Sequence, residues 1–277
     1  MRKLLLLVLA ACGSSSTGPD ATVDTIGPVY VPGDPLVVSA NSPGNDEDPA
    51  LLAGRDGAIY LAWYSHAYGD HIVISRTDDG VHWTAPVRIT SGAAVDYGPS
   101  LYQDQAGVFH VAFFRWETGA PPGKIVHARS IDQDGLSWDG TSSNDVTDAN
   151  ATDDWVPSLA ANADGDLVVA FARNTCPPPS TCYAIETATS RAAGASWDAP
   201  VAVVSAGAGE QHHLPAIALD HGELAIAWVP YASTASAPWA DVQSGAHVSL
   251  LRGGTTTAIT TAQPTSVTLF PTFYAVG

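Results

Sequence analysis

The sequence has few charged residues and very few basic ones. Lys and Arg total 11 against 28 Asp and Glu, charged residues make up 14% of the chain, and the formal net charge is −17. An acidic surface of this kind repels phosphate backbones, which argues against a nucleic-acid partner. A glycine-rich phosphate loop, an HExxH pair and a GxSxG motif are also missing, so no common catalytic signature assigns a reaction.

Cysteine occurs only three times, and the first copy closes the N-terminal segment MRKLLLLVLAAC, residues 1–12. Two basic residues precede an apolar run that is too short to span a bilayer. The ending Leu-Ala-Ala-Cys resembles a bacterial lipobox, which implies cleavage before Cys12 and lipid attachment to it. Residues 13–27 are rich in Gly, Ser, Thr and Asp and predict a flexible tether before a folded domain at 28–277. We expect a bacterial envelope protein on a periplasmic or extracellular face that touches the membrane only through its lipid.

The two remaining cysteines, Cys176 and Cys182, bracket a proline-rich loop. An even remainder in an oxidising compartment predicts a structural disulfide. Nothing nearby in the sequence completes a metal site, and His212 and His213 are adjacent, so in a strand they point to opposite faces. We therefore expect neither a metal nor another cofactor.

Glycine and proline are plentiful, with 25 and 20 copies, and they punctuate a repeat. Each repeat opens with a proline before an apolar run, turns at a glycine seven or eight residues later, and reaches an Ala-aromatic pair 13 or 14 residues after the proline. The prolines are Pro49, Pro99, Pro157 and Pro215, the glycines Gly57, Gly107, Gly165 and Gly222, and the aromatics Trp63, Phe113, Phe171 and Trp228.

The segments between these markers are β-branched and aromatic, without a helical stripe, as in Ile59-Tyr-Leu-Ala-Trp63. Third and fourth strands follow in each unit, for example His71–Arg76 and Pro86–Ile89. Four antiparallel strands in 50 to 58 residues describe a propeller blade, and such units must stack to bury both faces. The predicted fold class is all-β: a β-propeller with about four complete four-stranded blades, starting near residues 46, 96, 154 and 212, and a partial blade from 268.

A turn motif lies between the third and fourth strands. It reads RTDDGVHW at 76–83, SIDQDGLSW at 130–138 and SRAAGASW at 190–197. The matching positions are Asp78, Gly80 and Trp83, then Ser130, Asp132, Gly135 and Trp138, then Ser190, Gly194 and Trp197. This pattern resembles the Asp-box of sialidase-like propellers. We interpret these residues as fold markers, because a carboxylate binds turn amides, glycine allows the turn and tryptophan packs over the hairpin.

The two ends of the repeat array do not match. Pro35–Ser39 resembles the fourth strand of a blade, whereas Phe270–Gly277 supplies only the opening strand of a fifth unit. We expect a chain truncated relative to a six-bladed ring. The other interpretation is an unusual closure in which the last strand pairs with the N-terminal one.

Candidate ligand-binding residues form two columns just before the repeat prolines, where first strands reach a propeller mouth. The columns are Asp46, Asp96, Asp154 and His212, and Glu47, Tyr97, Trp155 and His213. Acids and aromatics together suit a sugar, although Asp also caps strand starts. Two residues after the Ala-aromatic pair stand Arg115 and Arg173, which are predicted to fork around a carboxylate or to form salt bridges.

These residues leave three functions open. The first is a monomeric propeller that binds a glycan or protein ligand through Asp96, Tyr97, Asp154, Trp155, His212, Arg115 and Arg173. The second is an exo-sialidase-type glycoside hydrolase, which the resemblance implies, with Asp46 and Asp96 as the acid candidates. The family's arginine triad and its Tyr–Glu pair are not matched here. The third is a scaffold in a surface assembly.

Overall fold

A computed structural model describes residues 38–39, 45–117, 123–139, 143–148, 153–162, 164–177, 180, 182–207, 210–220, 223–232, 247–252 and 255–260. The chain separates into two compact units, Met1–Asn41 and Ser42–Gly277, and all the strands lie in the second. The leader, the tether and the partial fifth blade fall outside the described residues. Within the part that is described, no helix has the length and apolar character needed to cross a membrane.

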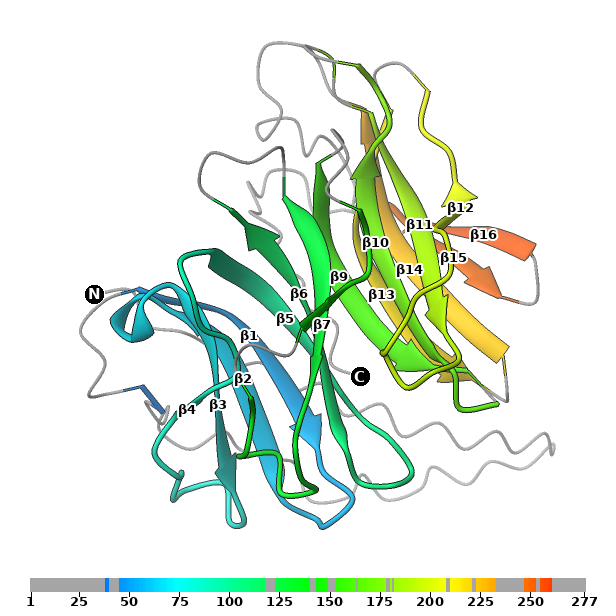
Figure 1. Cartoon of the computed structure of the whole chain (residues 1–277). Helices are drawn as coiled ribbons and strands as arrows, with labels where there is room; N and C mark the ends of the chain where they lie inside the picture. The colour runs from blue at the N-terminus through cyan, green and yellow to red at the C-terminus, as the bar shows by residue number, and fades with distance from the viewer. Residues whose placement is uncertain are drawn as a thin grey trace, which may run out of the picture. The chain divides into compact units, whose positions relative to one another are not determined.

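The strands form four antiparallel four-stranded sheets in chain order, which confirms the predicted blades (Figure 1). Blade 1 contains β1 (Asp46–Ala53), β2 (Ile59–Ser65), β3 (His71–Thr77) and β4 (Val87–Arg88), with the short 3-10 helix η1 (His66–Tyr68) after β2. Blade 2 contains β5 (Val95–Gln103), β6 (Phe109–Trp116), β7 (Lys124–Arg129) and β8 (Ser143–Asp145). Blade 3 contains β9 (Asp154–Ala161), β10 (Leu167–Asn174), β11 (Tyr183–Ser190) and β12 (Val201–Val204). Blade 4 contains β13 (Glu210–Asp220), β14 (Glu223–Ala232), β15 (His247–Arg252) and β16 (Thr255–Thr260).

Consecutive blades pack face to face, and their first strands β1, β5, β9 and β13 contact one another in turn. Three hydrophobic clusters fill the spaces between them, which we call the first seam (blades 1 and 2), the second seam (blades 2 and 3) and the third seam (blades 3 and 4). Alternate residues of one strand serve different seams, so Phe113 joins the first cluster and Phe114 the second. The two-residue period of a strand therefore distributes each blade's apolar residues over both of its faces.

The repeat proline marks a β-bulge in the first strand of every blade. Proline cannot donate to the strand ladder, and the register shifts around it in all four blades. The residue before each proline has a positive φ: Asp48 (55°), Gly98 (58°), Val156 (48°) and Leu214 (53°). After this shift, the residue three before the proline lies opposite the end of the second strand, which pairs Asp96 with Arg115 and Asp154 with Arg173.

A hydroxyl after the proline ties neighbouring blades together. The backbone N–H of Leu159 donates to Ser100 Oγ at 2.9 Å across the second seam. The N–H of Ile217 donates to Ser158 Oγ at 3.1 Å across the third seam in the same way. Blade 1 has Ala50 at this position, so the first seam has no such bond through that side chain.

The Asp-box turns share a hydroxyl at one register position, which is Thr77, Ser130 and Ser190. In the first copy this position falls on Thr77, one residue after Arg76, which opens the sequence RTDDGVHW. The amides of Val81 and His82 donate to Asp79 Oδ1 at 2.8 and 2.7 Å, so Asp79 binds the turn where Asp78 was expected.

The displaced Asp78 pairs with Arg76 instead, at 2.7 Å. The physical reason is that the two following amides point at Asp79, which lies directly before the turn glycine. In the second copy, Trp138 Nε1 donates to the carbonyl of Gly135 at 2.8 Å, which closes the turn as the motif predicts.

Candidate ligand site at the strand ends

The candidate site lies at the end of the blades where first strands begin and second strands finish. An open pocket of about 420 Å³ occupies this end, beside the loop that leads from β4 to β5. It is lined by Ser91, Gly92, Ala93, Ala94, Arg115 and Glu117. The pocket thus contains one predicted ligand-binding residue, Arg115, together with one acid that the sequence did not single out, Glu117.

The acid column and the predicted arginines meet in blade 2. Arg115 Nε and Nη2 donate to Asp96 Oδ1 and Oδ2 at 2.7 and 3.1 Å, and Nη1 donates to Ser143 Oγ at 3.1 Å. The Asp96 carboxylate is fully buried, whereas the Arg115 side chain is 13% exposed. This is a bidentate ion pair whose guanidinium stacks on the preceding aromatic of the same strand face, Phe113, with 5.2 Å between its central carbon and the ring centroid.

The same pair recurs in blade 3 with an additional acid. Arg173 donates to both oxygens of Asp154, at 2.8 and 3.0 Å, and its Nη1 lies 2.9 Å from Glu186 Oε2. Burial raises the pKa of Asp154, although Arg173 counteracts part of that shift. Burial also raises the pKa of Glu186, and the nearby Asp154 carboxylate adds to the effect. One guanidinium therefore holds two carboxylates.

Glu186 occupies a position that is apolar in the preceding blades. It lies opposite Phe171 in its blade, just as Val73 lies opposite Trp63 and Val126 opposite Phe113. Both valines are completely buried. Aligning the third strands by their turn hydroxyls (Thr77, Ser130 and Ser190) places Val73, Val126 and Glu186 at the same position. Aligning the strands by their first residues, such as Tyr183, hides this replacement of valine by glutamate.

The outer members of the acid column have other neighbours. Asp46 lies opposite Ser65 and accepts a hydrogen bond from Trp63 Nε1 at 3.2 Å. His212 lies opposite Pro230, and its ring meets Trp228 edge-on at 6.5 Å. Only blades 2 and 3 therefore carry the Asp–Arg pair.

The aromatic column packs across the seams. Tyr97 meets the Tyr64 ring at 4.4 Å across the first seam, and Trp155 stacks on Phe114 at 4.5 Å across the second. His213 contacts Tyr183 at 4.3 Å across the third seam. Each of these rings from one blade thus covers an aromatic ring of the blade before it.

An exposed aromatic stands beside the pocket. Trp116 ends β6, directly before the pocket residue Glu117, and is 48% exposed. Glu117 lies 3.1 Å from Lys124 Nζ, which also contacts Asp145 at 3.0 Å. Neither Trp116 nor Glu117 was predicted from the sequence, because both follow the repeat frame and do not belong to it.

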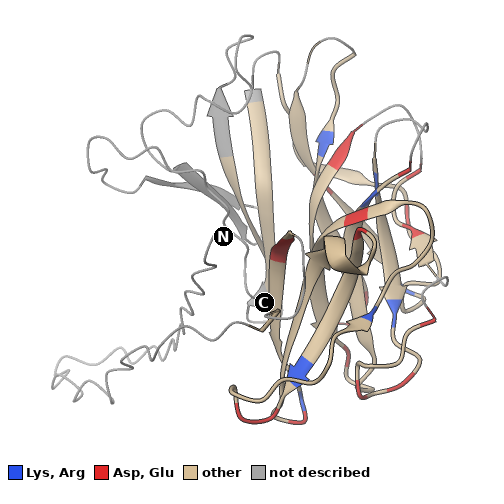
Figure 2. Ribbon diagram, turned by 90° about the vertical axis from the view of Figure 1, so that its left-hand side faces the viewer, with Lys and Arg blue, Asp and Glu red and all other residues tan. Residues whose placement is uncertain are grey.

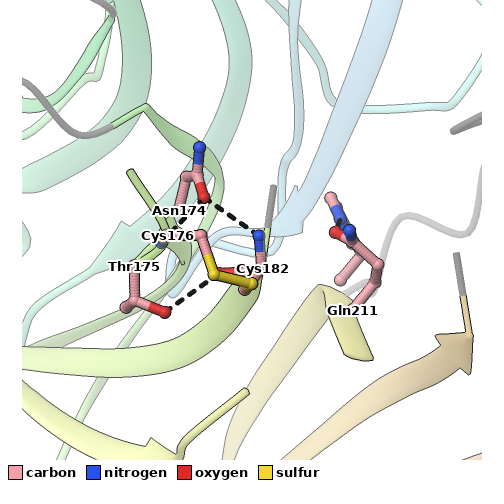
Figure 3. Close-up of a disulfide and its surroundings, with 6 residues drawn as sticks. Asn174, Thr175, Cys176, Cys182 and Gln211 are labelled. Carbon is pink, nitrogen blue, oxygen red and sulfur yellow. Dashed lines mark hydrogen bonds between the residues drawn. A yellow bond between two sulfur atoms is a disulfide. The ribbon is translucent and has the colours of Figure 1, made fainter. Parts of the chain in front are cut away.

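The predicted disulfide joins Cys176 to Cys182, with the two Cα atoms 5.2 Å apart. The loop that it closes follows β10, at the same end of the blade as Arg173. Asn174 Oδ1 accepts from the amides of both cysteines, at 3.2 and 3.0 Å, which fixes the loop to the strand end (Figure 3). Gln211, at the start of the first strand of blade 4, lies near the bridge.

Acids dominate the described surface, and Figure 2 shows Asp and Glu spread over strand ends and loops with far fewer Lys and Arg. Within the described ranges, no group of three or more His, Cys, Asp or Glu side chains is arranged to hold a metal ion. The acids at this end of the blades are instead held by arginine, lysine, tryptophan and tyrosine side chains.

No protein-family model matches the chain, and no curated protein matches it by sequence. Solved structures do match. A Hadza microbial sialidase is 17% identical with a TM-score of 0.57, covering 78% of this chain and 46% of its own. An α-L-arabinanase of Penicillium chrysogenum complexed with arabinobiose is 15% identical with a TM-score of 0.58, covering 80% and 69%.

The third match is a GH93 α-L-arabinofuranosidase of Fusarium graminearum in complex with arabinobiose. It is 14% identical with a TM-score of 0.58, covering 78% of this chain and 66% of that one. The chain thus spans about half the length of the sialidase and about two thirds of the arabinan-degrading enzymes. Together with the four stacked antiparallel blades, these similarities show that the chain has a sialidase-like β-propeller fold.

Proposed function

We propose that this chain is an envelope lipoprotein whose propeller binds a glycan at the strand-end site. The observation that carries the proposal is the pocket beside Arg115 and Glu117, with the exposed Trp116 next to it. Carboxylates accept hydrogen bonds from sugar hydroxyls, and an exposed indole offers a face on which a sugar ring stacks. The structural neighbours complexed with arabinobiose support a glycan as the ligand class.

The anchoring part of the proposal rests on the leader, which ends at Cys12. We propose that lipid on Cys12 and the tether that follows hold the propeller at a periplasmic or extracellular face. Metabolic labelling with palmitate in a bacterial host should mark the full chain, and Cys12→Ser should abolish the label. Labelling that persists in Cys12→Ser would contradict this anchor.

Binding is tested with the full chain, purified in detergent, on an array of immobilised oligosaccharides. We expect Trp116→Ala to weaken the best glycan about tenfold or more, because stacking on one aromatic side chain is worth about 1–3 kcal/mol for a nucleic-acid base and we expect a sugar ring to gain a comparable amount. Exposed Val81, at the turn between β3 and β4, serves as a matched control at the opposite end of its blade. Equal loss in Val81→Ala and Trp116→Ala would argue against this site.

A glycoside hydrolase is the second candidate. It is favoured by Asp154 and Glu186, two carboxylates that share one guanidinium and whose pKa values are both raised by burial. A carboxyl group with a raised pKa can act as a general acid, and a retaining glycosidase needs a partner carboxylate about 5 Å away. Release of a fluorophore from aryl glycosides, lost in Glu186→Gln, would support hydrolysis over binding alone.

A further inference from the structure

Each arginine of the site uses its Nε–Nη2 edge to bind a carboxylate of the protein itself. In blade 2, Asp96 takes Nε and Nη2 of Arg115, and Ser143 takes Nη1. In blade 3, Asp154 takes Nε and Nη2 of Arg173, and Glu186 lies against Nη1. A ligand carboxylate would have to displace Asp96 or Asp154 in order to gain the side-on fork formed by Nε and Nη2.

Displacement is costly because the internal partners are buried. Asp96 and Asp154 are completely inaccessible to solvent, and removing the counter-ion of a buried charge is strongly destabilising. The ligand's carboxylate would also approach further acids, since Glu117 lines the pocket and Asp153 precedes Asp154. Like charges brought together in a partly buried site repel one another more strongly than they do in water.

We infer that the site takes uncharged glycans, and that Asp96, Asp154 and Glu186 are specificity determinants that reject sugars bearing a carboxylate. This inference rests on the proposed glycan-binding function and names its substrate class. The inferred specificity differs from that of a sialic-acid binder. The sequence pattern allowed for such a binder, because it predicted that the two arginines fork around a carboxylate or form salt bridges. The acids at the pocket would instead accept hydrogen bonds from hydroxyl groups.

Glu186 is the most informative of the three for a test. It stands where blades 1 and 2 have a buried valine, so blade packing does not require a carboxylate there. Arg173 is 17% exposed, which leaves part of its guanidinium within reach of solvent. Glu186→Gln removes one negative charge and keeps the side-chain shape, so it lowers the electrostatic barrier to a carboxylated ligand without opening a cavity.

The experiment compares neutral arabino- and galacto-oligosaccharides with their sialylated counterparts, using the full chain in detergent and isothermal titration. Wild-type protein should bind a neutral oligosaccharide at least about tenfold more tightly than a sialylated one. Glu186→Gln should strengthen the sialylated ligand at least about fivefold relative to the neutral one, since it removes one negative charge that repels the ligand carboxylate. Asp198→Asn, which removes one carboxylate at the opposite end of blade 3, should change neither.

The possible results distinguish the inferred specificity from the proposed glycan binding. Wild-type protein that binds sialylated glycans as tightly as neutral ones overturns the specificity inference and leaves glycan binding in place. Equal changes in Glu186→Gln and Asp198→Asn overturn the role of Glu186, because overall charge would then explain both. A wild-type protein that binds no glycan of either class overturns the proposed function together with the inference.

Discussion

The first and second seams join successive blades with the same architecture but with different chemistry. In the first seam, Tyr60 packs on Phe109 with 4.4 Å between ring centroids, and Ile74 is completely buried. At the corresponding register positions in the second seam stand His110 and His127, which are equally buried. The same backbone arrangement therefore accommodates either the Tyr–Ile pair or the His–His pair. The buried nitrogens of the histidines, however, need hydrogen-bond partners.

Several polar groups of the second seam have partners. His110 Nδ1 and His127 Nε2 lie 3.0 Å apart, and His110 Nε2 lies 3.3 Å from Asp104 Oδ2. Near the ligand site, the same seam holds Glu186 beside Arg173, where the first seam holds Val126 beside Arg115. The comparison teaches that seam packing is general to the blades, and that the added acid and histidines are particular to one place in the chain.

The largest expected effect comes from removing the buried acid of each Asp–Arg pair. Asp96→Ala should lower the free energy of unfolding by about 3–5 kcal/mol, because Arg115 keeps only Ser143 among its described partners. Asp154→Ala should cost less, about 1–3 kcal/mol, because Glu186 remains beside Arg173. Urea denaturation monitored by tryptophan fluorescence measures both.

Asp78→Ala is the control for that comparison, because this exposed acid pairs only at the surface and should change stability by less than about 0.5 kcal/mol. A double variant, Asp154→Ala with Glu186→Val, sharpens the test. It should approach the cost of Asp96→Ala, since both partners of Arg173 are then removed. If Asp96→Ala and Asp154→Ala cost the same, Glu186 does not compensate for Asp154.

The second effect is the pH dependence that the buried histidines of the second seam contribute. Burial lowers the pKa of His127 to about 3 and also lowers that of His110, against about 6.5 in an unfolded chain. The unfolded state therefore binds more protons than the folded state between about pH 6.5 and 3, so stability falls as the pH is lowered through that window. Asp104 opposes the shift of His110, and Arg129 reinforces both shifts.

Replacing the pair by the residues of the first seam, His110→Tyr with His127→Ile, should reduce this slope. Denaturation midpoints in urea at pH 7, 6, 5 and 4 provide the measurement, and the slope should fall by about a factor of two. His82→Ala, which changes a histidine that is exposed, should leave the slope unchanged. If the double variant keeps the wild-type slope, titratable groups other than these two histidines cause the pH dependence.

The blades were predictable because their signals are local. Proline and glycine at fixed spacing, with alternating apolar strands between them, define each hairpin without reference to the rest of the chain. The pairing of Asp96 with Arg115 was harder to see, because it depends on a bulge at the repeat proline. Val156 and Leu214 give no sign of that bulge, since β-branched and bulky residues avoid positive φ.

The candidate site was only half predictable for a related reason. Asp96 and Arg115 stood out as repeated residues, yet their repetition reflects a buried ion pair shared by two blades. Glu186 breaks the repeat, whereas Trp116 and Glu117 follow it. A search for residues that the blades share does not find residues that differ between them. Departures from the repeat, read at the correct register, are the better indicators of a site.

The third effect concerns the hydrogen bond that joins blades 2 and 3. Ser100→Ala should cost about 1 kcal/mol of unfolding free energy, because the amide of Leu159 loses its acceptor in a partly buried position. Ala50→Ser introduces the same hydroxyl into blade 1 and should stabilise the first seam by a smaller amount if Leu101 N–H can reach it. A Ser100→Ala variant as stable as the wild type would show that water replaces the hydroxyl.

The last effect tests the bulge itself. Val156 has φ 48° directly before Pro157, a conformation that β-branched residues rarely adopt, whereas blade 2 has Gly98 with φ 58° at the same place. Val156→Gly should stabilise the fold by about 0.5 kcal/mol, because relief of about 1–2 kcal/mol of strain exceeds the entropic cost of glycine. Gly98→Val should destabilise it by about 1–2 kcal/mol, and thermal unfolding of the two variants measures the difference. If both exchanges destabilise equally, the valine side chain contributes packing in the second seam that outweighs its backbone strain.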